Sequence, residues 1–312
     1  MLALLMGCVI SSPEKSLEGV GKSSQTSPDI SSKKLTSLPV RSPCETDAPG
    51  EILTASGFGM SLIPAGEFTM GHQHTADRHE DEEPHSVLIS RPYYLATTEL
   101  TQFVWERITG FNPSPADDCG SDCPVKMVSW CDVVQFANLL SAVDGLPPVY
   151  RLPDGFRLGM TEELCNEKSL DVRMDLTSLG YRLPTEAEWE RASRGLRQTH
   201  YPGSDDPSEV GWWKENSDGK LHAVAGKKQN GFGLYDMLGN VWEWCWDVHD
   251  GYGGVLQIDP VGPDSGHSRT HRGGAYDFGR GGGRLGNRNR SGPGNKSHAI
   301  GFRLAKTAPC RD

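Results

Sequence analysis

The most conspicuous chemistry in the sequence lies at residues 230–247, N-G-F-G-L-Y-D-M-L-G-N-V-W-E-W-C-W-D. The second half of this stretch alternates strictly, in the order Trp242, Glu243, Trp244, Cys245, Trp246 and Asp247. Alternation of this kind is typical of a β-strand, so the three indoles should share one face and pack on a core. The opposite face then carries two carboxylates and a thiol, which are costly to bury without partners. We expect a disulfide and a bound cation to satisfy that face.

A second group of candidate functional residues lies in the C-terminal part of the chain. Seven arginines are spaced there among glycines: Arg269, Arg272, Arg280, Arg284, Arg288, Arg290 and Arg303. The planar guanidinium group suits recognition of carboxylate, phosphate or sulfate, so the region is a candidate site for an anionic ligand. The alternative is that these arginines pair with buried acidic residues of the scaffold. The predicted ligand-binding set, which adds two aromatic residues, is Trp242, Arg272, Tyr276, Arg280, Arg284, Arg288 and Arg290.

A third pattern is the segment 72–85, in which four histidines stand among five carboxylates. Imidazole and carboxylate are common metal ligands, so one hypothesis for this segment is a metal site. The other hypothesis is a solvated acidic loop.

The eight cysteines, Cys8, Cys44, Cys119, Cys123, Cys131, Cys165, Cys245 and Cys310, contain no paired C-x-x-C set of the kind that holds zinc. Disulfides of an exported protein are the better interpretation. The sequence does not fix their connectivity. Cys119 and Cys123 are close enough for a small local loop, and Cys131 is one hypothesis for a partner of Cys245.

The run at 233–244, G-L-Y-D-M-L-G-N-V-W-E-W, is similar to the hallmark of the formylglycine-generating enzyme family, also called sulfatase-modifying factors. Further segments resemble the family in the same order, at residues 60–71, 99–103, 124–141, 181–192 and 272–304. The resemblance implies one α+β domain over residues 58–306, C-type-lectin-like and poor in regular secondary structure. Several ordered motifs are far more specific than any one alone.

The same resemblance implies an activity whose key residues are absent. Enzymes of the family oxidise a sulfatase cysteine with oxygen, using copper(I) held by two cysteines just after an R-G-G-S-Y segment. Where those cysteines would stand this chain has Phe278 and Gly283, and Ala275 replaces the serine. Thiolates are the ligands that soft copper(I) requires, so we expect neither copper nor catalytic residues.

A structural calcium ion is the cofactor that the resemblance does imply. Asp236, Gly239, Val241 and Glu243 fall at positions that bind calcium in family members, and carboxylate and carbonyl oxygens are suitable ligands. The alternative is that Glu243 pairs with an arginine and Asp236 caps a turn. Family members also commonly carry an acidic D-E-x-P stretch at the position of 81–84, which favours the solvated-loop interpretation there.

Local signals predict the elements that must position these residues. Helices should begin after Thr101, Ser129 and Thr185, each an N-cap residue, and end near Gly110, Gly145 and Gly195. Strands are expected at 60–70, as a hairpin-like pair about residues 64–66, and at 87–89 and 93–95. Trp105, Trp130 and Trp189 are predicted core anchors.

The N-terminal part of the chain has a different character. Residues 1–8 end in L-M-G-C, which looks like a lipoprotein signal with Cys8 as the acylated residue. Residues 9–57 are rich in Ser, Pro and Lys and are predicted to be a disordered tether, and 307–312 a tail. These features predict a lipoprotein of a bacterial cell envelope, anchored in the outer membrane through Cys8 and facing the periplasm or the surface.

Composition narrows the function. With 41 acidic and 31 basic side chains the net charge is −10, which disfavours nucleic acid as a partner. Glycine and proline, 37 and 21 residues, make up nearly a fifth of the chain and predict a loop-rich fold. We predict a monomeric binding or accessory module for a protein or small anionic ligand. The alternatives are a protein-cysteine oxidase acting on sulfatases, or a related oxidoreductase, and a surface scaffold whose 272–292 region is smooth and filled.

Overall fold

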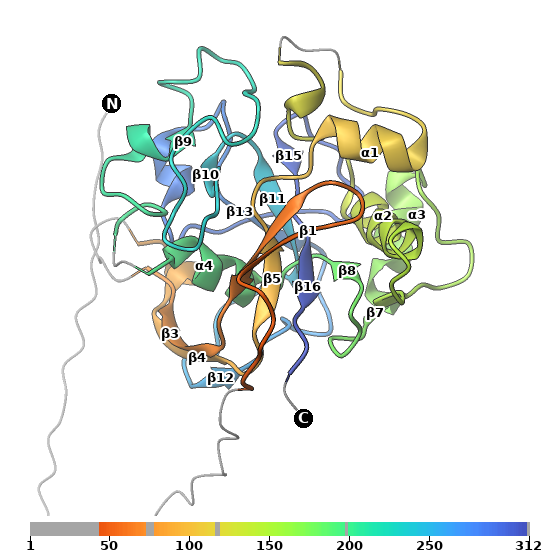
Figure 1. Ribbon diagram of the computed structural model, residues 1–312, viewed down its shortest axis with the longest axis horizontal. Helices are drawn as coiled ribbons and strands as arrows, with labels where there is room; N and C mark the ends of the chain where they lie inside the picture. The colour runs from red at the N-terminus through yellow and green to blue at the C-terminus, as the bar shows by residue number, and fades with distance from the viewer. Residues whose placement is uncertain (1–43, 73–77, 116–118, 197–198, 311–312) are drawn as a thin grey trace, which may run out of the picture. The chain divides into compact units, whose positions relative to one another are not determined.

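The structure is a computed structural model that describes residues 44–72, 78–115, 119–196 and 199–310 (Figure 1). The predicted lipid-anchor residue, Cys8, and residues 1–43 lie outside the described part. Within that part, no helix is both long enough and apolar enough to cross a membrane.

Short elements joined by long loops make up the domain, as its glycine and proline content predicts. The α-helices are α1 (Gln102–Thr109), α2 (Trp130–Val143), α3 (Glu162–Lys168) and α4 (Glu186–Arg194). The longer strands are β1 (Glu51–Leu53), β2 (Gly59–Ile63), β3 (Gly66–Met70), β4 (His85–Ile89), β5 (Tyr93–Ala96), β11 (Trp242–Val248), β13 (Arg269–Arg272), β14 (Asn289–Ser291) and β16 (Ala305–Thr307). The two-residue strands are β6 (Tyr150–Arg151), β7 (Arg173–Met174), β8 (Tyr181–Arg182), β9 (Gly211–Trp212), β10 (Leu238–Gly239), β12 (Gln257–Ile258) and β15 (Ile300–Gly301). Among the short 3-10 turns, η1 (Glu80–Glu82) and η5 (Arg280–Gly283) border the candidate site.

Three sheets form the scaffold. One has the strand order β1-β2-β5-β16-β8, the second β14-β13-β11-β15 and the third β12-β4-β3. Figure 1 shows β5, β16 and β11 through the middle of the domain, with α1, α2 and α3 on one side and α4, β3 and β4 on the other. The α+β fold class is therefore confirmed.

Strand β11 is the centre of this arrangement, and every one of its residues is buried. The face with Trp242, Trp244 and Trp246 packs in the larger core, together with the predicted anchors Trp105 and Trp130. The other face contributes Cys245 to a separate core that contains Trp189. The prediction of one shared indole face is confirmed, and burial on both sides explains why the polar face needs partners.

The helix boundaries follow the predicted caps. The hydroxyl groups of Thr101, Ser129 and Thr185 each accept a hydrogen bond from the first turn of α1, α2 and α4. Asp132 and Glu188 complete two capping boxes. These signals are local, which is why the sequence alone locates them.

The strand pairing near the N-terminus differs from the prediction. β2 and β3 form where strands were expected, but they do not pair as a hairpin. β2 pairs with β1 and β5, whereas β3 pairs with β4 in another sheet. The ordered domain also extends beyond 58–306, since β1 lies in the predicted tether and β16 reaches Thr307.

Three cysteine pairs are joined, namely Cys44–Cys310, Cys119–Cys123 and Cys131–Cys165. The local loop between Cys119 and Cys123 is confirmed. The hypothesis that Cys131 pairs with Cys245 is wrong, because Cys245 is a buried free thiol. The Cys44–Cys310 bridge joins the last part of the predicted tether to the predicted tail.

Candidate functional site: a groove beside the tryptophan strand

Two adjoining cavities form a groove where the predicted ligand-binding residues gather. Their volumes are 770 Å³ and 560 Å³, and both are lined by His79, Gly282 and Asn287. We call the combined space the Trp242 groove. The other residues that line it are Glu80, Asp81, His200, Tyr201, Trp242, His249, Phe278, Arg280, Gly281, Arg284, Arg288, Asn289 and Arg290. The hollow surface contradicts the filled surface expected of a pure scaffold.

Buried acidic residues hold three of the predicted ligand-binding arginines. Arg284 donates to Glu82 over 2.9 and 3.0 Å, and Arg288 donates to Glu186 over 2.6 and 2.8 Å. Arg272 donates to Glu190. All three guanidinium groups are therefore bound within the scaffold, as the alternative interpretation of the arginine cluster anticipates.

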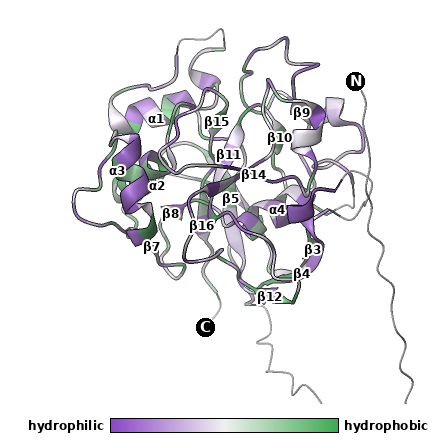
Figure 2. Ribbon diagram, turned by 180° about the vertical axis from the view of Figure 1, so that it is seen from behind, coloured by the Kyte–Doolittle hydropathy of each residue, from purple (hydrophilic) through white to green (hydrophobic). Residues whose placement is uncertain are grey.

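Helix α4 supplies most of these acids. Figure 2 shows α4 as largely hydrophilic, although Glu186, Glu188 and Glu190 on it are all buried. Glu188 pairs with Arg182, and Glu190 also accepts from Arg194 over 2.6 Å. Burial opposes ionisation of Glu186, but the positive charges of Arg288 and Arg272 prevail and lower its pKa to about 2. Helix α4 thus supplies buried carboxylates that hold arginines of the C-terminal part in place.

Two arginines remain exposed at the groove. Arg280 lies in η5 and Arg290 in β14. Trp242 lies in the wall of the 770 Å³ cavity, 2% exposed, with its ring edge-to-face against Phe278 at 5.6 Å. Within the described residues, the Nε1 donor of Trp242 has no hydrogen-bond partner. Tyr276 does not line the groove and lies near Lys126 instead.

The polar face of β11 is satisfied differently from the prediction. Glu243 accepts two hydrogen bonds from Arg303, both of 2.7 Å, and one of 2.6 Å from Trp189. Asp247 accepts from the Glu186 backbone over 2.7 Å. The guanidinium group of Arg303 and the indole of Trp189 therefore satisfy the Glu243 carboxylate, for which we had expected a bound cation. Cys245 on the same face forms no disulfide.

The predicted calcium ligands do not form a complete oxygen shell, and the acidic side chains here are not among the described groups of three ligand atoms within 4.8 Å of one another. Asp236 has a left-handed backbone with φ of 55°, and its Oδ2 accepts from Ala225. Its Oδ1 is buried and has no hydrogen-bond partner within the described part of the chain. Glu99, which the sequence analysis missed, lies beside these residues and accepts from Val241 over 3.1 Å. One free carboxylate oxygen and a surplus of buried acids fit a cation, whereas the oxygens of Glu243 are already bound.

Of the two positions that correspond to the copper cysteines, Phe278 lines the groove, and Gly283 follows Gly282, which also lines it. Phe278 is exposed and Gly283 is buried. A side chain at 283 has no room, since a Cβ there would lie 2.4 Å from Cγ of Leu238. Ala275 is buried in the core. The residue types at these positions do not supply a cysteine pair, and the space around Gly283 would not accommodate one.

The histidine-rich segment is more deeply embedded than a solvated loop. Glu82, His72 and His85 are buried, while His79 is exposed; His74 lies outside the described residues. Nε2 of His249, which the sequence analysis did not single out, lies 3.3 Å from the carboxylate of Asp81. Asp81 and His249 are far apart in the sequence and share no motif, so the sequence alone could not predict this contact.

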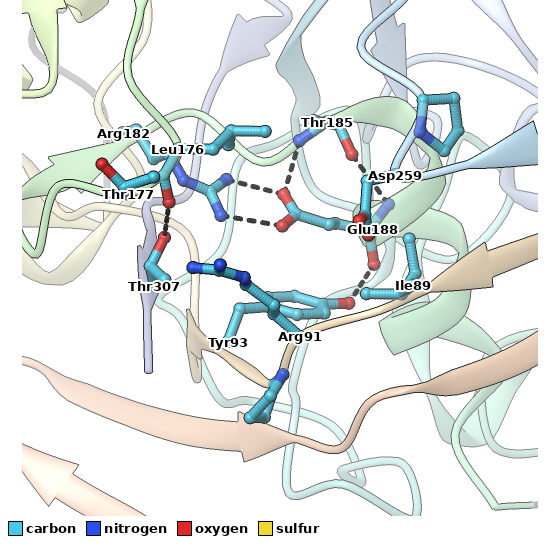
Figure 3. A pocket seen from close by; sticks show the side chains of 12 residues that line it. Ile89, Arg91, Tyr93, Leu176, Thr177, Arg182, Thr185, Glu188, Asp259 and Thr307 are labelled. Carbon is cyan, nitrogen blue, oxygen red and sulfur yellow. Dashed lines mark hydrogen bonds and ion pairs between the residues drawn. The ribbon is translucent and has the colours of Figure 1, made fainter. Parts of the chain in front are cut away.

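A second, smaller cavity of 160 Å³ lies beside β5 and α4 (Figure 3). In Figure 3 the side chains of Arg182 and Glu188 face one another across two hydrogen bonds of 2.6 and 2.7 Å. Its central charges therefore neutralise each other. One exposed arginine, Arg91, also lines this cavity. The Trp242 groove is several times larger and has two exposed arginines, Arg280 and Arg290, which makes it the better candidate site.

Comparison with known proteins agrees with this architecture. Residues 48–308 match the family model described as "Sulfatase-modifying factor enzyme 1-like domain". The formylglycine-generating enzyme of Streptomyces coelicolor is 30% identical over 303 residues, which covers 86% of this chain and 95% of that enzyme. The chain therefore belongs to the formylglycine-generating enzyme, or sulfatase-modifying factor, family.

Two further relatives are named for other roles. "Chaperone protein LppX" of Paenibacillus barcinonensis is 34% identical over 182 residues, covering 50% of this chain and 62% of that protein. The solved structure of "Treponema denticola variable protein 1" superposes with a TM-score of 0.75 at 32% identity, covering 83% of this chain and 99% of that chain. Membership of the family thus leaves the activity open.

Proposed function

We propose that this chain is a binding or accessory member of its family, anchored to a bacterial envelope, that takes an anionic ligand in the Trp242 groove. The observation that carries the proposal is the pair of exposed arginines, Arg280 and Arg290, that line the groove. Exposed guanidinium groups can bind carboxylate, phosphate or sulfate through charge-assisted hydrogen bonds. The chaperone name of one relative favours an accessory role.

The binding proposal is tested by tryptophan fluorescence with a heparin-derived tetrasaccharide, a probe that carries carboxylate and sulfate groups. We expect saturable quenching, weakened about tenfold in Arg290→Met because one charge-assisted contact is lost. Arg91→Met, an exposed arginine outside the groove, is the matched control. Equal titrations for both variants, or none for the natural protein, would contradict the proposal.

Copper-dependent oxidation is the competing function. Our proposal is that it is absent, because Phe278 and Gly283 supply no soft ligand for copper(I). The purified chain would be incubated with copper(I), oxygen and a C-x-P-x-R peptide, beside the Streptomyces coelicolor enzyme as an active control. We expect no formylglycine by mass spectrometry. Conversion of the peptide would establish the oxidase alternative and direct attention to other ligands.

Anchoring through Cys8 gives a prediction of its own. Cys8→Ser removes the thiol that would be acylated, so we expect the protein to move from the membrane fraction to the soluble fraction of the producing bacterium. Mass spectrometry of the natural N-terminus would show the lipid. Cys44→Ser, which alters a cysteine of the folded domain, is the control and should not change the fraction. Identical partition of Cys8→Ser and the natural chain would exclude the anchor.

Calcium is the proposed structural cofactor, held by the free Oδ1 of Asp236 and the carbonyls of Gly239 and Val241. Glu243 would join them by giving up a hydrogen bond from Arg303 or Trp189. We expect saturating calcium to raise the melting temperature by about 5–10 °C over the EDTA-treated protein, because a ligand that binds only the folded state stabilises it. Asp236→Asn should lose most of this response. Magnesium, which prefers a smaller octahedral shell, should not replace calcium. Equal melting curves with calcium and EDTA would rule the ion out.

A further inference from the structure

Arg269 is the one arginine of the C-terminal group that is buried without an acidic partner in the described part of the chain. It is 4% exposed and donates to two backbone carbonyls, that of Trp246 over 2.7 Å and that of Ser169 over 2.8 Å. Its Cζ lies 3.8 Å from the ring centroid of Trp130, so the guanidinium group also stacks on an indole. A guanidinium group has more donors than these two hydrogen bonds use, which leaves it able to bind a further acceptor.

An irregularity in the strand pairing positions this guanidinium group. From Trp244 to Val248 the strand β11 advances four residues, while its partner β13 advances only two. The backbone N–H of Trp246, within this bulge, donates to the carbonyl of Pro184 over 2.9 Å and not to β13. The carbonyl of Trp246 then accepts from Arg269. Bulges of this kind redirect side chains beside functional sites.

The charge of Arg269 is not compensated by a neighbouring acid among the described residues. Burial lowers the pKa of Arg269 to about 10, and the attraction of Asp247 does not offset this effect. The guanidinium group therefore stays cationic at neutral pH. Burial raises the pKa of Asp247 to about 8, so that carboxyl group stays protonated there. A buried charge without a counterion is costly, and an anion in contact with it would be stabilised.

Arg269 lines a cavity of 410 Å³ that shares no lining residue with the Trp242 groove. Eight of the eleven residues that line this cavity are apolar, and they come from β11, from residues 170–176 and from the loop at 261–264. The other two charged residues of the lining, Arg173 and Asp264, are both exposed and opposite in sign. The cavity thus combines apolar walls with one buried cation.

We infer that this cavity binds a monoanionic amphiphile, a carboxylate on a medium-length aliphatic chain, with the carboxylate on Arg269. Apolar walls with one well-placed polar group are typical of small-molecule sites. One buried cation matches one negative charge, since the charges of Arg173 and Asp264 balance each other. A cavity of about 150 Å³ accommodates a benzene ring, so 410 Å³ has room for about 16 non-hydrogen atoms, which decanoate does not exceed. The inference does not depend on the ligand of the Trp242 groove.

The experiment is isothermal titration calorimetry of the full chain with sodium decanoate at neutral pH. We expect saturable binding of one decanoate per chain, and at least about tenfold weaker binding of 1-decanol, which lacks the charge. Arg269→Met keeps a side chain that can lie over the Trp130 ring but removes the cation, so it should weaken decanoate binding about 10–100-fold. Val261→Asp, at an exposed position of the cavity wall, should weaken it about fivefold through charge repulsion.

Val255→Asp is the matched control for the second variant, because Val255 is exposed in the same segment but lines neither this cavity nor the Trp242 groove. It should bind decanoate as the natural chain does, and so should Arg290→Met, which alters the other site. Melting curves show whether each variant is folded; if Arg269→Met is not, Val261→Asp decides.

Three results would overturn the inference: no binding by the natural chain, equal affinity for decanoate and 1-decanol, or unchanged affinity in the folded variants of the cavity. Loss of decanoate binding in Arg290→Met alone would also overturn it, since it would place the ligand in the Trp242 groove.

Discussion

Arg272→Met is expected to lower the free energy of unfolding by about 3–5 kcal/mol, because buried Glu190 and Glu186 each lose one of their two cationic partners. The guanidinium group is fully buried and donates to Glu190 and to the backbone carbonyls of Leu285 and Gly286. It therefore joins α4 to the chain that leads into β14. Chemical denaturation by urea, followed by tryptophan fluorescence, measures the loss.

Arg290→Met is the matched control, because this arginine belongs to the same predicted ligand-binding set but is exposed. Surface ion pairs contribute about 0–1 kcal/mol, so its unfolding free energy should stay within that range. The pair of variants separates scaffold arginines from ligand-binding ones. If Arg272→Met unfolded like Arg290→Met, the ion pairs on α4 would not be stabilising the domain.

A third variant tests the cause of the Arg272 effect. Glu190→Gln in the Arg272→Met background removes one buried negative charge that has lost a cationic partner. We expect it to recover part of the lost stability, since most of the penalty comes from the stranded carboxylate and not from the missing attraction. Recovery is incomplete, because Glu190 also accepts from Arg194 and from the backbone of Gly71.

Local signals in the sequence were sufficient for elements whose determinants lie within a few residues. The capping boxes Ser129–Asp132 and Thr185–Glu188 define helix starts through hydrogen bonds between neighbours, and the alternation of 242–247 defines a strand. The pairing of β2 with β5 involves residues thirty or more positions apart, and the turn signal at 64–66 favoured the wrong neighbour. Strand existence was therefore predictable, but partner choice was not.

In the candidate site, too, local features were predictable from the sequence and long-range pairings were not. Composition and spacing identified a basic C-terminal region beside a tryptophan strand, and the groove does lie there. The arginines that are not free are bound by acids far away in the sequence. Arg272, Arg288 and Arg284 pair with Glu190, Glu186 and Glu82, which lie 82, 102 and 202 positions away. A helix that reads as amphipathic and charged gives no indication that its glutamates are buried. Only the fold distinguishes Arg290 from Arg288, two residues before it.

The second large effect concerns Asp247 and pH. Burial, with the negative charge of Glu186 second, raises the pKa of Asp247 from 3.8 to about 8. The folded protein thus keeps this carboxyl protonated at pH values where the unfolded chain has released the proton. Stability from this group is complete below about pH 4 and falls as pH rises toward 8, at up to about 1.4 kcal/mol per pH unit.

Asp247→Asn should remove that loss, because asparagine stays neutral and its carbonyl can still accept from the Glu186 backbone. We expect the variant to match the natural chain near pH 4 and to be more stable by a few kcal/mol near pH 8, measured by urea unfolding across the range. Asp264→Asn, an exposed aspartate, is the control and should leave the pH profile unchanged. The groups that face Asp247 are Glu186, Arg288, Glu188 and Arg269, and two of these are cationic. If their charges outweighed burial and Glu186, Asp247 would be ionised in the folded state, and the variant would then be less stable than the natural chain at pH 8.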